Sequence, residues 1–471
     1  MRFLLAFLTL PLAFTAPGQQ RWTLERCMQR AQERNLDLRN AALNADLAGK
    51  AHDQAWWNFL PSLNAAATHG YNWGKTIDQY TNTFATDRVR TNNFYLSSDV
   101  TLFQSASKHK VLKQAALNEE ASGKALEAAR NDINTAVVRA FLDLLGMREQ
   151  VQAAEGQAAA TRAQAAATQD MVDAGRAARA DLLNIQAQLA QDEYNAENLG
   201  IQAEKARLTL AQLMQLPLEE MQGFDIEAPA ISAAITGPTA SEGEVLTNVL
   251  ASNPAYAQAD LAMRSAEFSI GIARAAALPS LSFNASLGTG YSGRNLEAIG
   301  FPQQQGSILI GATNDGTPVY APNYSQATRV KSFTQQLNDN LNESIGLTLS
   351  LPLFNNMRNR YATDQARVQY EQAKNALLKS RNALQVDVQN ALTAQRGAYR
   401  QYISAKLAMD ASAEALRMAE ERFAVQAATA TDLNAAKARL QQTTAQVITA
   451  KYSFLMAEKA LDILQGRPIT L

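Results

Sequence analysis

The sequence predicts an α+β membrane protein built from an internal duplication. In the predicted fold, a trimeric 12-stranded β-barrel, with four strands per chain, continues into a long α-helical coiled-coil barrel. Three observations support it: segments that recur in the same order, four strands with membrane-type alternation, and two very long proline-free helices. The 471 residues carry a formal net charge of −1, so the chain lacks the basic excess expected of a protein that binds nucleic acid.

The amino terminus predicts a signal peptide at residues 1–18. Arg2 precedes an apolar run over residues 3–14, and small residues follow at Ala16-Pro17-Gly18. This run has about 12 apolar residues, whereas a helix needs roughly 20 to cross a bilayer. We therefore expect the segment to direct export and to be cleaved near Gly18.

A single cysteine and only three histidines limit the chemistry of the chain. They exclude internal disulfides and disfavour His/Cys metal clusters, so no metal and no cofactor is expected. Charged Glu25 and Arg26 precede Cys27, where a lipoprotein attachment site would have small residues. Cys27 is therefore predicted to pack inside a helix.

Two offsets relate the halves of the duplication. Pro61 matches Pro279 at 279 − 61 = 218, and Phe103 matches Phe354 at 354 − 103 = 251. Other pairs follow the same offsets: Asn35 with Asn253 at 218, and Asp181 with Asp432 and Pro217 with Pro468 at 251. The difference, 251 − 218 = 33 residues, indicates one longer loop in the second copy. We expect a first repeat at 19–217, a linker or equatorial region at 218–244 and a second repeat at 245–471.

Alternating side chains predict strands at about 60–73, 93–104, 278–291 and 342–354. In the second of these, one face carries Phe94, Leu96, Ser98, Val100 and Leu102, and the other carries Tyr95, Ser97, Asp99 and Thr101. In the fourth, Ile345, Leu347, Leu349, Leu351 and Leu353 oppose Ser344, Gly346, Thr348, Ser350 and Pro352. Each strand has about 10 residues or somewhat more, as a tilted strand across a bilayer requires. A soluble sandwich with one wet face would alternate similarly, but the sequence lacks enough further strands for a second sheet.

Aromatic residues gather at both ends of these strands, as in the two girdles of an outer-membrane barrel. They are Trp56, Trp57, Phe59, Phe103 and Phe354 at one end, and Tyr71, Trp73, Tyr95 and Tyr291 at the other. The stretches between paired strands, 72–92 and 292–340, are predicted to be external loops. The second of them is expected to hold the 33 extra residues.

Four strands cannot close a barrel, and hydrocarbon does not tolerate open edges because every backbone amide and carbonyl needs a partner. Closure must therefore come from other copies of the chain. Two copies would give 2 × 4 = 8 strands with a filled interior, and three would give 3 × 4 = 12 strands with room for a water-filled lumen. We favour the homotrimer, with Asp99 and the rest of the polar face lining the lumen.

Each second strand is followed by a predicted helix of unusual length, at about 105–171 and 357–423. Such a helix would reach about 100 Å. Its apolar residues alternate four and three apart, as in a coiled-coil seam: Ile133, Val137, Ala140, Leu144, Met147, Val151, Ala154 and Ala158, with positions 251 further on in the second copy. Both helices turn at 173–180 and 424–431, and return helices complete hairpins at 105–216 and 357–466.

The tips of the two helical hairpins share a pattern. Val172, Gly175 and Asp181-Leu182 in the first copy correspond to Phe423, Gln426 and Asp432-Leu433 in the second. With the paired Leu-Pro-Ser-Leu segments and strand-to-helix junctions, this arrangement resembles the TolC-type outer-membrane efflux protein family, or outer membrane factors, over essentially the whole mature chain.

The resemblance implies a homotrimeric channel in the outer membrane of a Gram-negative bacterium, extending into the periplasm and in contact with outer-membrane lipid. It also implies two partners, a periplasmic adaptor (membrane fusion) protein and an inner-membrane transporter. The residues that it assigns to adaptor docking at the tips are Gly175, Arg176, Gln426 and Ala427.

Asp181, Phe423 and Asp432 are tip or gate candidates by the same resemblance. The alternative for Asp181 and Asp432 is helix N-capping after the turn. Family members carry glycine where Gln426 stands, tyrosine where Phe423 stands, an arginine near Ala428 and an acidic ring near Ala435. This chain therefore departs from the family pattern at its periplasmic end.

We expect a passive export channel of a tripartite efflux or type I secretion system, which conducts substrate from pump and adaptor to the exterior. The alternative is a periplasmic coiled-coil adaptor or structural protein of an export machine, which would show one hairpin flanked by small β domains and lack membrane-type strands. No nucleophile–base set, paired histidines or phosphate loop stands out, so an enzyme is not expected.

Overall fold

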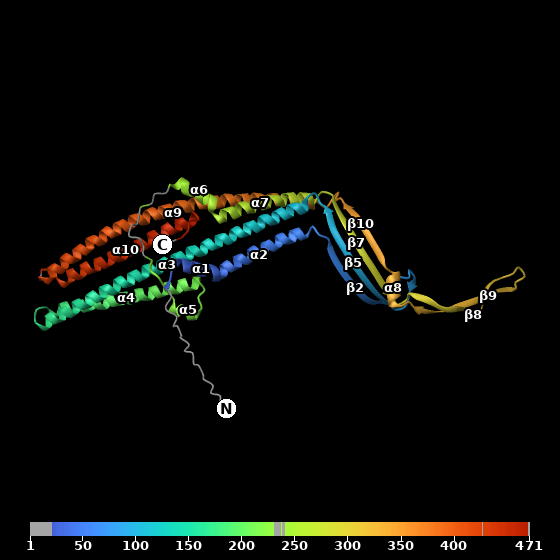
Figure 1. Ribbon diagram of the computed structural model, residues 1–471, viewed down its shortest axis with the longest axis horizontal. Helices are drawn as coiled ribbons and strands as arrows, with labels where there is room; N and C mark the ends of the chain where they lie inside the picture. The colour runs from blue at the N-terminus through green and yellow to red at the C-terminus, as the bar shows by residue number, and fades with distance from the viewer. Residues whose placement is uncertain (1–20, 230–236, 238–240, 426, 470–471) are drawn as a thin grey trace, which may run out of the picture. The chain divides into compact units, whose positions relative to one another are not determined.

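The computed structural model describes residues 21–229, 237, 241–425 and 427–469 (Figure 1). The predicted signal peptide lies outside the described residues. The chain divides into a helical unit, at 1–50, 116–265 and 370–471, and a sheet unit, at 51–115 and 266–369. Each compact unit contains segments from both repeats. The boundaries between the two units therefore differ from the boundary between the two repeats. Among the described residues, no helix is both long enough and apolar enough to cross a membrane.

The duplication is visible element by element. At the offset of 218, α1 (Leu24–Arg34) and α2 (Leu36–Trp57) correspond to α6 (Glu242–Ser252) and α7 (Pro254–Ala275). At the offset of 251, α3 (Ser107–Asp173) and α4 (Arg179–Leu213) correspond to α9 (Arg358–Ala424) and α10 (Ala430–Leu464). Corresponding helices are equal in length, 67 residues for α3 and α9 and 35 for α4 and α10.

The helical unit contains the returning hairpins, in which α4 runs back along α3 and α10 runs back along α9 (Figure 1). Its main core surrounds α3, where Val137, Phe141 and Leu144 are fully buried together with Cys27 of α1. Burial raises the pKa of the Cys27 thiol to about 12. The prediction that this cysteine packs inside a helix is therefore confirmed.

The predicted coiled-coil seams also pack inward. In α3 the seam positions are all buried or half-buried, and in α9 the corresponding positions from Leu384 to Met409 are so as well. In the second copy, α6 closes a smaller core, in which Val245 and Val249 pack against Leu384 and Val388. Between the repeats, α5 (Leu218–Gly223) leads to β6 (Asp225–Ile226), which pairs in parallel with β1 (Arg21–Trp22).

The sheet unit is built around one antiparallel sheet of four strands in the order β10-β7-β5-β2. The strands are β2 (Ser62–Asn72), β5 (Val89–Phe103), β7 (Ser280–Ser292) and β10 (Asn342–Ser350). Their positions lie close to those expected from alternation, although β10 ends before Leu351. A bulge between Thr101 and Phe103 shifts the register of β5 against β7, so Phe103 occupies the apolar-face position that we predicted for Leu102.

The two stretches predicted to be loops are structured. The first contains the short pair β3 (Thr76–Ile77) and β4 (Phe84–Ala85). The second is not an open loop, because β8 (Leu296–Ala312) and β9 (Pro318–Val330) form a long hairpin and α8 (Phe333–Asp339) follows it. Both faces of that hairpin are largely exposed. Apolar and polar residues do not alternate regularly along these two strands, so no period-two signal marks the hairpin in the sequence.

Candidate functional site

The four-stranded sheet has two chemically different faces. Residues paired directly across neighbouring strands lie on the same face, and the register runs from Ser62 through Asp99 and Asn284 to Gly346. Nearly all positions on that face are Ser, Thr, Asn, Gly or Asp. We call it the polar face. The predicted lumen residue Asp99 therefore lies among hydroxyl and amide groups in the middle of the polar face.

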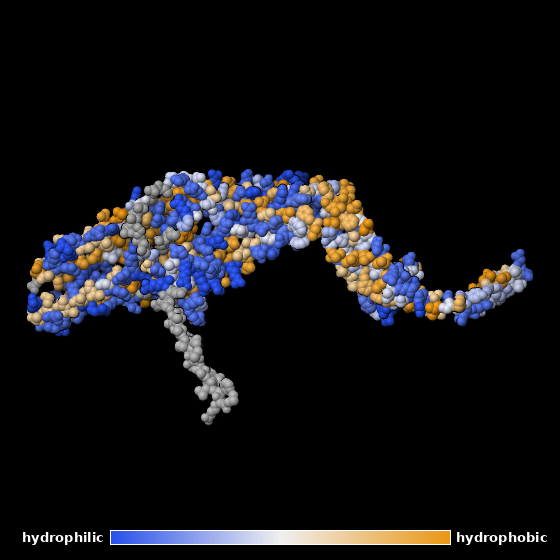
Figure 2. All heavy atoms as spheres, viewed as in Figure 1, coloured by the Kyte–Doolittle hydropathy of each residue, from blue (hydrophilic) through white to orange (hydrophobic). Residues whose placement is uncertain are grey.

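The opposite, apolar face carries branched and aromatic side chains that project into open space in the single chain. On β10 the exposed fractions are 79% for Ile345, 65% for Leu347 and 70% for Leu349. Figure 2 shows apolar residues gathered over the strands of this sheet. Most polar members of this face lie toward the end where the connections to α8 and β3 begin: His69, Arg90, Asn92, Thr289 and Glu343. Ser98 is the exception and lies further along the sheet, between Leu63 and Ala285. One prediction is wrong here: the register puts Tyr95 on the polar face, so it is not part of an outward aromatic girdle.

The sheet is open at both sides. Its outer strands, β2 and β10, each pair with one neighbour, so one row of backbone N–H and C=O groups on each remains without a strand partner. An apolar face together with two open edges is unsuited to water or to lipid in isolation. This surface therefore indicates pairing with strands from further copies.

The first helical tip ends in a glycine turn. Gly175 has φ +67°, its N–H donates to Val172 O at 2.9 Å, and Arg176 N–H donates to Met171 O at 2.7 Å. These bonds form the Schellman pattern that ends a helix at a left-handed residue. Gly175 and Arg176, predicted for adaptor docking, are both exposed.

The second tip repeats this closure with different residues. Ala427 N–H donates to Arg422 O at 2.8 Å, which is the bond of Arg176 shifted by 251. Ala427 is exposed and Phe423 is half-buried at the end of α9. Gln426, another predicted docking residue, lies outside the described residues, so the glycine-free turn is described only on its flanks.

The helix that follows each tip starts differently. At the second tip, Thr429 and Asp432 form a capping box, in which Asp432 Oδ2 accepts from Thr429 N at 3.1 Å and from Thr429 Oγ1 at 2.7 Å. These hydrogen bonds lower the pKa of Asp432. At the first tip, the cap position is Ala178, which has no side-chain bond, and Asp181 lies in the first turn of α4. N-capping thus accounts for Asp432, whereas a gating role for Asp181, Phe423 or Asp432 stays a prediction.

Buried polar groups connect the two hairpins near their tips. Lys437 of α10 is 6% exposed and donates to Gln164 Oε1 of α3. Nearby on α4, Asp192 is 2% exposed and accepts from Thr161 Oγ1 at 2.8 Å. Burial lowers the pKa of Lys437, while the carboxylates of Glu420 and Asp192 oppose that shift. A buried cation with this partner set favours one relative position of the hairpins.

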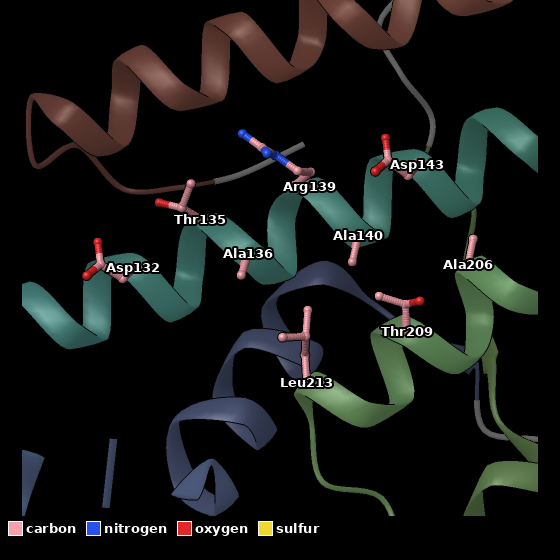
Figure 3. A pocket seen from close by; sticks show the side chains of 9 residues that line it. All are labelled: Asp132, Thr135, Ala136, Arg139, Ala140, Asp143, Ala206, Thr209 and Leu213. Carbon is pink, nitrogen blue, oxygen red and sulfur yellow. The ribbon is translucent and has the colours of Figure 1, made fainter. Parts of the chain in front are cut away.

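An open groove of about 400 Å³ lies between α3 and α4 (Figure 3). Asp132, Arg139 and Asp143 stand along α3, while Thr209 and Leu213 approach from α4. Burial raises the pKa of Asp143, and Arg139 opposes the shift. The lining includes neither histidine nor cysteine, the side chains that most often serve as catalytic base or strong nucleophile. The groove is thus a surface between two helices, with acidic and basic side chains along α3.

Comparison with known protein families identifies the family of this chain. The model of the outer membrane efflux protein family matches residues 27–214 and 245–467, which covers both repeats. The chain belongs to the outer membrane efflux protein family. This efflux protein is thus an outer-membrane protein, and solved outer membrane channels share its fold.

Individual relatives agree with this assignment. The efflux protein is 24% identical over 345 residues to the pyoverdine export outer membrane protein OpmQ of Pseudomonas putida, a match that covers 72% of this chain and 64% of that relative. It also shares its fold with the CmeC outer membrane channel of Campylobacter jejuni, at a TM-score of 0.75 and 16% identity, covering 94% of this chain and 85% of CmeC. The outer membrane protein VceC of Vibrio cholerae matches at a TM-score of 0.74 and 16% identity, covering 95% and 97%.

Sequence reasoning missed one cluster in the efflux protein. Asp78, Ser292 and Gln336 are all buried at the end of the sheet, where Ser292 is hydrogen-bonded to each of the other two. They are separated by 214 and 44 residues along the chain and belong to types common in any loop.

Proposed function

We propose that this chain forms one third of a passive export duct across the outer membrane. In this role it conducts substrate delivered by an inner-membrane transporter and a periplasmic adaptor to the exterior, as part of a tripartite efflux or type I secretion system. The observation that carries the proposal is the four-stranded sheet with one polar face, one exposed apolar face and two open edges. Such a sheet satisfies its backbone in lipid only when other copies close it.

Three copies are the favoured number, because 3 × 4 = 12 strands enclose a lumen wide enough for water. The helices support the same closure. In the single chain, α4 exposes Tyr194, Ile201 and Leu208 at intervals of seven residues, which is the repeat of a helix seam that awaits a partner. α9 likewise leaves Leu407 and Met418 exposed. Neighbouring copies would cover both surfaces and continue the strands as a helical tube.

The tips would provide the contact with the adaptor. Gly175 and Arg176 at the first tip and Gln426 and Ala427 at the second are the proposed docking residues, on the strength of the family resemblance and of the exposure of the three described ones. The periplasmic adaptor as an alternative identity has less support, because the chain carries two helical hairpins and a two-faced sheet. The relative OpmQ is named for pyoverdine export.

Ion selectivity in planar bilayers tests the proposed lumen. Asp99 lies on the polar face and Glu343 on the apolar face, so Asp99→Asn and Glu343→Gln remove the same charge from opposite sides. We expect trimers with Asp99→Asn to lose cation preference, seen as a shift in reversal potential under a salt gradient, because rings of carboxylates select cations. Trimers with Glu343→Gln should keep the wild-type value. Purified trimers that conduct no ions would contradict the proposal.

A further inference from the structure

Residues 73–88, between β2 and β5, form a compact segment rather than a free loop. β3 and β4 pair within it, and Asp78 at its turn is only 2% exposed. Asp78 Oδ1 accepts from the backbone N–H groups of Tyr80 at 3.0 Å and Thr81 at 2.9 Å, and Asp78 N–H donates to Thr83 O at 2.9 Å. The carboxylate thus fixes the turn from inside.

The 73–88 segment is fastened to the polar face of the sheet. Ser292 Oγ donates to Asp78 Oδ2, and Tyr80 Oη donates to Asn93 Oδ1 at 2.6 Å. Ser292 and Asn93 both occupy polar-face positions in the strand register. A Cβ at Gly290, which pairs with Asn93 on the same face, would overlap the Tyr80 hydroxyl. The tyrosine ring therefore rests directly on the glycine backbone.

The opposite face of the same sheet end is covered by a different element. The ring of Phe333 in α8 packs edge-on against the ring of Phe94, with 6.1 Å between the ring centroids. Its centroid lies 5.5 Å from that of Tyr291, and both partner residues are on the apolar face. Gln336 of α8 accepts from Ser292 N–H at 2.9 Å and donates to Ser292 O at 3.1 Å. Ser292 is therefore held by α8 through its backbone and by the 73–88 segment through its side chain. The two connections take opposite sides of the sheet.

We propose that the 73–88 segment is a size-limiting constriction at the outer end of the duct. The proposal rests on the proposed function, because the polar face lines a lumen only when copies close the sheet. On that closure, three copies would each carry one segment across the inner wall, fixed by Asp78 and Tyr80. Its lumen-side surface would meet the exported solute with Lys75 and Phe84, both of them exposed. The segment would thus set the largest solute that can leave.

Single-channel conductance of purified trimers tests the constriction. In Asp78→Ala/Tyr80→Ala trimers the fastening is lost, and we expect conductance to rise about twofold or more because it follows pore diameter. Gly290→Ala should act in the same direction, because the added Cβ would displace Tyr80; it would also lie 2.6 Å from the backbone oxygen of Asn92, so trimer mass in detergent is measured alongside. Gly288→Ala is its matched control, since a Cβ there meets nothing closer than Tyr95 Cδ2 at 3.7 Å. Asp78→Ala/Tyr80→Ala trimers with wild-type conductance would overturn the proposed constriction.

A second test leaves the fastening intact. Gln79 is an exposed position of the 73–88 segment, and the native Cys27 is fully buried. A bulky charged thiol reagent on Gln79→Cys trimers should lower conductance in steps, one for each copy. The same reagent on Asn314→Cys, in the exposed turn of the β8–β9 hairpin, should leave it unchanged. Conductance unaffected by modification at position 79 would refute the constriction, whereas wild-type trimers without any conductance would instead refute the proposed function.

Discussion

The two repeats of this chain have long helices of identical length and strand connections of different length. α3 and α9 have 67 residues each, and α4 and α10 have 35 each. By contrast, the connection from β2 to β5 has 88 − 73 + 1 = 16 residues and that from β7 to β10 has 341 − 293 + 1 = 49. This difference, 49 − 16 = 33, accounts for the whole change of offset. Buried seams preserve length, because an inserted residue would rotate every following side chain out of the seam.

The tips differ in chemistry rather than in length. The first uses a left-handed glycine, and the second uses a capping box on the helix that follows. Both close with the same backbone hydrogen bond, from Arg176 to Met171 and from Ala427 to Arg422. The comparison indicates that the turn geometry is constrained, while the side chains presented there are free to suit two different contacts.

The largest expected effect should come from arginine substitutions on the two faces of the sheet, at positions that correspond between the repeats. Leu349 and Ser98 are 251 apart on the apolar face, and Ser350 and Asp99 are 251 apart on the polar face. Leu349 lies level with Phe103 toward one end of the sheet. Arginine facing lipid costs about 2–4 kcal/mol at the bilayer centre and less toward the interfaces, so we expect Leu349→Arg to lower the amount of protein in outer-membrane fractions severalfold. Ser350→Arg should assemble and alter conductance. Equal assembly of the two variants would show that the assignment of faces is wrong.

The next effect concerns the tips. Removing one helical turn from both arms of either hairpin should abolish export and adaptor co-purification, because the docking residues would withdraw from the adaptor by about 5 Å. Trimer formation, measured by mass in detergent, should be unchanged since the sheet is untouched. If export survives at one tip and not at the other, the two tips are functionally unequal. Survival at both would contradict docking through the tips.

A smaller effect should follow from exchanging the helix starts. Thr429→Ala removes the cap of α10, whereas Ala178→Thr offers one to α4, and a cap of this kind is worth about 1 kcal/mol. We expect amide hydrogen exchange in the first turn to become about fivefold faster in α10 of the first variant. Exchange in the first turn of α4 should slow in the second. No change at α10 would mean that the capping box does not stabilise this end.

The smallest effect is a pH dependence confined to the second tip. Hydrogen bonds from Thr429 lower the pKa of Asp432 in the folded state, so the carboxylate contributes stability that is present above its ordinary pKa. That contribution is lost as the pH falls through the lowered value. Carboxyl carbon NMR should show Asp432 titrating below a typical aspartate, and in Thr429→Ala the pKa should rise. An unchanged titration would contradict the capping role.

How far the sequence predicts this structure depends on the periodicity of its apolar residues. The four sheet strands and the long helices follow from alternation and seam spacing, because apolar residues such as Leu349 and Val388 recur at every second or every third to fourth position. The β8–β9 hairpin was not predicted because apolar and polar residues do not alternate regularly along its strands. α8 was too short to show periodicity.

The candidate site follows the same rule. Asp99 could be assigned to the polar face from alternation alone, and the tip residues could be located from the duplication. The contacts of Asp78, Ser292 and Gln336 could not, because they join three segments whose neighbourhood is created only by the sheet. The capping of Asp432 was one of two alternatives in the sequence, and the position of Thr429 three residues earlier favours it.

The central claim is that one chain supplies four of twelve strands and cannot complete the duct alone. Outer-membrane fractionation followed by native mass measurement of the detergent-extracted protein tests it most directly. The account predicts a membrane-bound assembly with three times the mass of the mature chain. A monomer that remains in solution without detergent would contradict it.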